Sequence, residues 1–140
     1  MASPFIKNKI MSKKVEVKYQ GKYKSTTKSP LNEEEITVNA VRFTPVDLLA
    51  SAYGSCLLGT IDYEAHKNQF ETPAARSEIV YEIDDVKSKV SEINVKIFLG
   101  KEYTAEQKGV IEKAAKEKCH VGNTIDPNIP RKYEFFYNAE

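Results

Sequence analysis

Residues 43–67 read FTPVDLLASAYGSCLLGTIDYEAHK, and this stretch decides the fold. Thr44 suits an N-cap, Pro45 suits the first helical position, and Asp47 occupies the capping-box position three residues on. The residues that follow are apolar on nearly every side, which predicts a helix over 44–67 that is buried on most of its faces. A chain of 140 residues with few other elements can hardly cover such a helix. We therefore expect a second copy of the chain to help cover it.

Apolar and polar residues alternate with period two on both sides of this helix, which predicts strands. Three strands precede the helix as an antiparallel meander, with a tight hairpin turn at Gln20–Gly21. A long hairpin, a second helix and a last strand follow it. The predicted strands cover residues 14–20, 23–27, 36–40, 78–84, 92–99 and 133–137, and the second helix covers 104–118. The order βββ-α-ββ-α-β predicts an α+β domain of mostly antiparallel sheet around a central buried helix.

The composition is that of one ordinary globular domain. The chain of 140 residues has 41% hydrophobic and 29% charged residues, and its 21 basic and 20 acidic side chains leave a net charge of +1. So balanced a charge predicts no nucleic-acid partner, and the apolar runs are too short to span a membrane. We read residues 1–12 as an N-terminal extension or tag, because Met11 offers a second start, and residues 13–140 as the single domain. No signal peptide is recognisable, so a cytoplasmic location is expected.

Two cysteines are the candidates for chemistry. Cys56 lies in the middle of the predicted first helix, and Cys119 lies on the buried stripe at the end of the second. Two cysteines are too few for a secreted disulfide scaffold. A buried cysteine is usually an inert small hydrophobe, so from position alone that interpretation stays open beside a functional one. Neither cysteine has a zinc-site spacing to the other or to His66 or His120, so we predict no metal and no cofactor.

Two segments carry a resemblance to a known family. FTPVDLLASAYGSC, residues 43–56, resembles the first signature of the OsmC/Ohr family, the osmotically inducible protein C and organic hydroperoxide resistance proteins. CHVGNTI, residues 119–125, resembles its second signature, and the similarity covers about residues 13–138. The resemblance implies an intertwined homodimer with two active sites at its interface, and a thiol-dependent reduction of organic hydroperoxides.

The resemblance also implies roles for the two cysteines. Cys56 matches the peroxidatic position and Cys119 the resolving position, and a dithiol or lipoyl-type reductant would then recycle the disulfide. The hydroperoxide-resistance branch carries a Glu ten residues before its first cysteine and an Arg in its N-terminal strands. This chain has Val46 at that position and lysines in those strands, so it is more similar to the general OsmC-like branch.

Three further residues are candidates for supporting roles. Asp47 lies about 13.5 Å along a straight helix from Cys56 and out of phase with it, which favours a capping role. Arg42 is either a cation that lowers a thiol pKa across a dimer interface or an ordinary surface residue. Tyr53 shares a helix face with Cys56. The alternative to a peroxidase is a non-catalytic dimer of the same fold, associated with stress or with binding of a hydrophobic ligand.

Overall fold

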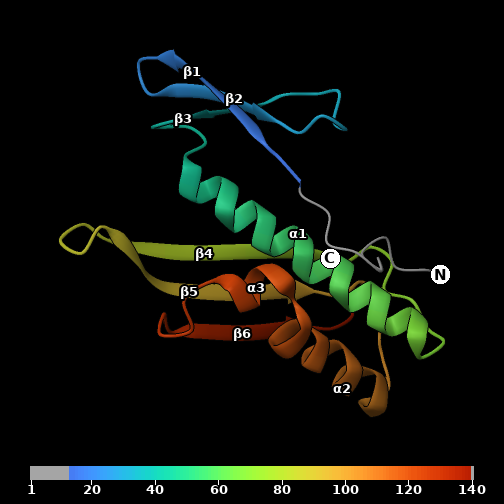
Figure 1. The fold of residues 1–140 in the computed structure, drawn as a ribbon. Coiled ribbons are helices and arrows are strands. Elements are labelled where there is room, and N and C mark those ends of the chain that lie inside the picture. Colours follow the sequence, from blue (N-terminus) through green and yellow to red (C-terminus); the bar gives the residue numbers. More distant parts are fainter. Residues whose placement is uncertain (1–12, 140) are drawn as a thin grey trace. The chain divides into compact units, whose positions relative to one another are not determined.

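A computed structural model of the protein describes residues 13–139, and it has the predicted α+β architecture (Figure 1). The predicted N-terminal extension over residues 1–12 lies outside the described residues. The chain divides into two compact units, one up to Pro45 and one from Val46 onward. Each unit has its own three-stranded sheet.

The first unit is the predicted antiparallel meander. Its sheet has the order β1-β2-β3, with β1 over Glu16–Gly21, β2 over Lys24–Lys28 and β3 over Ile36–Asn39. The prediction of a hairpin turn at Gln20–Gly21 is wrong by two residues, since the turn is made by Lys22 and Tyr23. Both have positive φ, 53° and 62°. Two consecutive left-handed residues match the twist of the flanking strands, and that match fixes where the hairpin reverses.

The apolar side chains at the start of this sheet are exposed. Val15, Val17 and Tyr19, which the alternation places on one side of the first strand, are 67%, 63% and 69% exposed. β1 is an edge strand with β2 as its only neighbour among the described strands. An exposed apolar row on an edge strand is typical of a surface that a partner covers.

The second unit holds the remaining elements (Figure 1). In chain order they are α1 (Pro45–Lys67), β4 (Arg76–Asp84), β5 (Lys89–Phe98), α2 (Ala105–Lys113), the π-helical turn η1 (Ala114–Lys118), α3 (His120–Thr124) and β6 (Arg131–Phe136). β4 and β5 form an antiparallel hairpin, whereas β6 lies parallel to β5. The segment from α2 to α3 is therefore a helical crossover between two parallel strands.

One face of α1 and one face of β5 build the core. Tyr53, Leu57 and Ile61 of α1 are buried and cluster with the buried side of β5 and with Ile111 of α2. The buried residues of β5 are the predicted alternating set, Ile93, Val95 and Ile97, followed by Leu99. The opposite side of α1 is exposed at Leu49, Ser51, Ala52, Ser55 and Gly59. Within one chain the helix is thus buried on one side only.

Two details differ from the sequence prediction. Ile83, expected to face inward with Ile79 and Tyr81, is 44% exposed, because the register of β4 and β5 shifts after Glu82 and reverses the alternation. The second helix begins as predicted, with a full capping box between Thr104 and Gln107, and it is followed by α3, for which the sequence pattern predicted no element. None of the helices described between residues 13 and 139 is long and apolar enough to cross a membrane.

Candidate active site

The fold brings the two cysteines together. Cys56 comes from the middle of α1, and Cys119 comes from the junction of η1 and α3, 63 positions later. Their thiols are hydrogen-bonded to each other and are not joined in a disulfide. Cys119 is buried and Cys56 is partly exposed. A protected thiol thus lies against one that solvent and small molecules can reach.

The surroundings of Cys56 favour its thiolate. Burial acts to raise the pKa of the Cys56 thiol, but four hydrogen bonds lower it, and the pKa ends below its ordinary value. The donors are the backbone N–H groups of Val121 and His120, the thiol of Cys119 and the hydroxyl of Thr60, whose Oγ1 lies 3.8 Å from the sulfur. The thiolate is the nucleophilic form of cysteine, and Cys56 is the thiol of the pair whose surroundings favour that form.

Cys119 has the opposite character. Burial raises the pKa of its thiol to about 11, against the hydrogen bond from the backbone N–H of Gly122 to Sγ at 3.4 Å. The hydrogen bond to Cys56 and the charge of the Cys56 thiolate raise the Cys119 pKa as well. At neutral pH Cys119 therefore keeps its proton and donates it in the hydrogen bond to Cys56.

The backbone around Cys119 explains these donors. Cys119 is extended, with φ −77° and ψ 117°, and it ends η1 and caps the N-terminus of α3. The first N–H groups of a helix have no partner within the helix. Those of His120 and Val121 bind the Cys56 sulfur, and that of Gly122 binds Cys119. These donors are not recognisable in the sequence, because a five-residue helix capped by cysteine has none of the usual start signals.

Tyr53 lies beneath α3. Its ring is buried and so close to Gly122 that a Cβ there would lie 2.8 Å from Tyr53 Cε1. Its hydroxyl group lies 3.1 Å from that of Tyr133, and Arg131 Nη1 donates to it at 3.3 Å. Tyr53 therefore supports the segment that carries Cys119 and the backbone donors to Cys56.

Arg131 binds the C-terminal end of α3. Its guanidinium donates to the backbone oxygens of Gly122 at 2.7 Å and Ile125 at 2.9 Å, where the last carbonyls of a helix lack partners. The sequence analysis did not identify Arg131. It lies at the start of β6, twelve positions after Cys119, and no local pattern marks it.

The other two predicted supporting residues have different positions. Asp47, in the first turn of α1, accepts a hydrogen bond from the hydroxyl group of Tyr81 on β4 and so anchors the start of the helix to the sheet. Arg42 is an exposed residue of the first unit, where it lines an open hollow with Lys22 and Lys24. Its backbone N–H donates to Asn39 Oδ1 at 2.6 Å.

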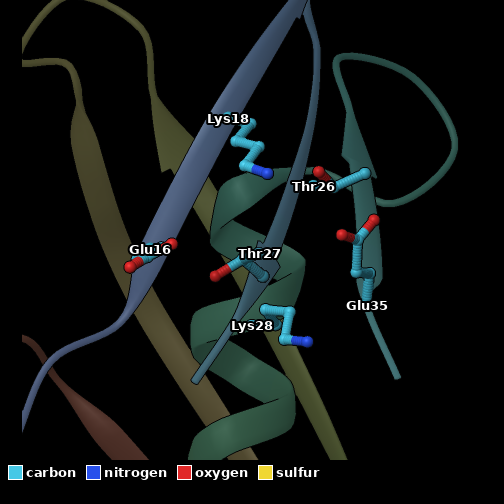
Figure 2. A pocket seen from close by; sticks show the side chains of 6 residues that line it. All are labelled: Glu16, Lys18, Thr26, Thr27, Lys28 and Glu35. Carbon is cyan, nitrogen blue, oxygen red and sulfur yellow. The ribbon is translucent and has the colours of Figure 1, made fainter. Parts of the chain in front are cut away.

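Two further hollows are small. Figure 2 shows a polar one in the first unit, about 30 Å³ in volume, lined by Glu16, Lys18, Thr26, Thr27, Lys28 and Glu35. An apolar one of about 20 Å³ in the second unit is lined by residues that include Ala50 and Tyr53 of α1 and Ile125. Either volume suits a water molecule rather than an organic ligand. Among residues 13–139 no cluster of three or more His, Cys, Asp or Glu side chains could hold a metal ion.

Comparisons with known proteins agree with this architecture. A family model described as OsmC-like protein matches residues 37–134. A structure from Psychrobacter arcticus 273-4, of a protein assigned to the osmotic stress and detoxification response, has a TM-score of 0.79 at 23% identity, over 94% of this chain and 98% of that one. The organic hydroperoxide resistance protein OhrB of Bacillus subtilis has a TM-score of 0.67 at 17% identity, over 89% and 98%.

A third solved structure, an OsmC-like protein from Mycoplasma pneumoniae, has a TM-score of 0.74 at 17% identity, over 91% of this chain and 99% of that one. No curated protein matches the sequence. Identities this low show that these proteins share a fold with this chain, but they do not show that they share its activity. The family model, in contrast, spans well over half of the 140 residues and contains both cysteine segments. The chain therefore belongs to the OsmC-like protein family.

Proposed function

We propose that this protein is a thiol-dependent peroxidase that reduces organic hydroperoxides, with Cys56 as the attacking thiolate and Cys119 as the resolving thiol. The observation that carries the proposal is the unequal thiol pair. Cys56 has a lowered pKa and partial exposure, and it is hydrogen-bonded to a buried, protonated Cys119. Reactive cysteines are those with stabilised thiolates that solutes can reach, whereas structural cysteines have neither property.

The reaction proceeds in two steps on these residues. The Cys56 thiolate attacks the terminal oxygen of the hydroperoxide, the O–O bond breaks, and the alkoxide leaves and takes up a proton to become an alcohol. Cys56 is thereby oxidised to a sulfenic acid. The Cys119 thiol then condenses with it, which forms a disulfide and releases water. A dithiol or lipoyl-type reductant restores both thiols by exchange, as a cytoplasmic setting requires.

The choice of an organic hydroperoxide as substrate is supported by the membership of the OsmC-like family and not by a pocket. Ala50 and Tyr53, six and three residues before Cys56, line the apolar hollow together with side chains of β4 and β5. This hollow is too small for either an organic hydroperoxide or a stored hydrophobic ligand, so it gives no support to the alternative, a non-catalytic dimer that binds such a ligand.

Exposure to a small excess of tert-butyl hydroperoxide should produce an intrachain Cys56–Cys119 disulfide and the loss of two free thiols per chain. The two thiols lie near enough to act on each other's pKa through a hydrogen bond, so we expect bridging to need only a modest movement. Mass spectrometry of thiol-blocked digests measures the linked peptide pair and the loss of two hydrogens. Two separately alkylated cysteines after peroxide treatment would contradict the peroxidase and support the non-catalytic dimer.

The functional form is proposed to be a homodimer. The exposed apolar row Val15, Val17 and Tyr19 and the open side of α1 are surfaces that a second copy would cover. We expect sedimentation velocity at micromolar concentration to give about twice the chain mass of 15.8 kDa. A stable monomer at that concentration would contradict the dimer and leave the cysteine roles unaffected.

A further inference from the structure

One stripe of α1 contacts the segment that carries Cys119 at two points. Cys56, Thr60 and Glu64 are spaced four residues apart, so they lie on one helix face. Cys56 binds Cys119 and the start of α3. Two turns further along, Glu64 Oε1 accepts a hydrogen bond from Lys118 Nζ at 2.7 Å. Lys118 directly precedes Cys119, so the ion pair and the thiol pair join the same two segments.

The backbone changes conformation at Cys119. The helix that begins at α2 ends in the π-helical turn Ala114–Lys118, and Cys119 itself is extended. The regular hydrogen-bond ladder of α2 therefore does not continue into α3. Side chains on either side of Cys119 bind this segment to the rest of the unit. Arg131 binds the carbonyls of α3 after Cys119, and Glu64 binds Lys118 before it.

Glu64 is a charged residue at a buried position of α1, which is unusual. It is only 8% exposed, and its carboxylate has two cations, Lys118 and Lys67. The hydrogen bond from Lys118 lowers the pKa of Glu64, burial opposes it, and the charges of both lysines lower it further, so the carboxylate stays ionised at neutral pH. The bond to Lys67 is longer, at 3.5 Å, and that side chain is 56% exposed. The Lys118 side chain is itself 43% exposed, so the shorter distance of 2.7 Å, and not deeper burial, makes Lys118 the closer partner of Glu64.

We propose that the Glu64–Lys118 ion pair positions Cys119 against Cys56 for disulfide formation. The inference rests on the proposed function only in taking Cys119 as the thiol that bonds to Cys56. A disulfide requires an S–S distance of about 2 Å and a narrow range of dihedral angles, so its formation depends on how closely the second thiol is confined. Removal of the pair takes away the contact of Lys118 with α1 and leaves Asn123 Nδ2, which donates to the backbone oxygen of Glu117 at 3.1 Å, as the side-chain tie between η1 and α3. The effective concentration of Cys119 at Cys56 then falls.

The reduction potential of the disulfide measures this confinement without any peroxide. The wild type, Lys118→Met, Glu64→Gln and the double variant would be equilibrated with mixtures of reduced and oxidised dithiothreitol. We expect each single variant to lower the effective concentration about tenfold, which raises the potential by about 30 mV. The double variant should match the single ones, since either change removes the same pair. Lys118→Arg should restore most of the effect, because it keeps the charge.

Lys67→Met is the matched control, since it removes the other cation of Glu64 and should leave the reduction potential unchanged.

A second readout is kinetic. Lys118→Met should slow the condensation of the Cys56 sulfenic acid about tenfold and change its formation less than twofold. A Lys118→Met potential within about 10 mV of wild type, or an equal shift in Lys67→Met, overturns the proposal. A shifted potential in a protein that does not react with hydroperoxides supports the positioning role and refutes only the peroxidase.

Discussion

Replacement of Cys56 by serine should abolish hydroperoxide reduction, with a loss on the order of 10³-fold or more. A serine hydroxyl is not ionised at neutral pH and has no thiolate to attack the O–O bond. The consumption of tert-butyl hydroperoxide in the presence of dithiothreitol measures this loss. Ser91→Ala is the control, because Ser91 is an exposed residue of β5 and lies outside both the thiol pair and the surface proposed for the dimer. Its rate should equal that of the wild type.

Cys119→Ser should behave differently. The attacking thiolate remains, so the variant should reduce one equivalent of hydroperoxide and then stop with a sulfenic acid on Cys56, which dimedone labels. The difference between the two variants separates an attacking from a resolving thiol. Equal and complete loss of the first turnover in both variants would contradict these roles. Full turnover in Cys56→Ser would contradict the choice of nucleophile.

Gly122→Ala should destabilise the fold by about 2 kcal/mol and weaken the thiolate of Cys56. The new Cβ would meet the buried ring of Tyr53 at 2.8 Å, and Tyr53 cannot retreat because Arg131 and Tyr133 hold its hydroxyl group. α3 must then shift, together with the N–H groups of His120 and Val121 that stabilise the Cys56 thiolate. Urea unfolding measures the free energy of unfolding of this variant.

The pH dependence of iodoacetamide alkylation measures the pKa of each thiol. In the wild type, Cys56 should react with a midpoint below the ordinary cysteine pKa, and Cys119 should stay unreactive until the pH approaches its raised value of about 11. Loss of hydrogen-bond donors to the thiolate raises the pKa of a thiol, so the Cys56 midpoint in Gly122→Ala should move upward.

Gly109→Ala is the control. A Cβ there contacts nothing within 4 Å, and alanine should stabilise α2 by up to about 1 kcal/mol. An unshifted Cys56 midpoint in Gly122→Ala would contradict the role of α3 in stabilising the Cys56 thiolate.

Locally encoded features of the fold could be predicted from the sequence. α1 begins at Pro45 and ends at Lys67 as expected, because its start signals lie within four residues. The alternation of β5 gave its buried side chains correctly. The bulge that turns Ile83 outward and the left-handed turn at Lys22–Tyr23 depend on how two strands pair, and single-strand patterns do not contain that information.

Of the candidate site, the sequence marks the two cysteines and Tyr53. The spacing of Cys56 and Thr60 on one face is a local pattern, and the structure has their side chains in contact. The contacts Arg131–Gly122 and Glu64–Lys118 join residues that are 9 and 54 positions apart, and nothing near each residue indicates its partner. The lowered pKa of Cys56 likewise comes from backbone N–H groups, which every residue except proline has and which no sequence motif marks here.

The parallel pairing of β5 with β6 has a consequence for how the protein is made. Its paired residues, such as Ile93 and Arg131, are 38 positions apart, whereas the hairpins pair near neighbours. The closure of so long a loop costs more chain entropy and is the slower event in folding. Arg131 cannot hold α3 until that strand has joined the sheet. We therefore expect Cys56 of a nascent chain to have an ordinary pKa until the segment of Cys119 has packed against α1, since the groups that lower this pKa lie on that segment.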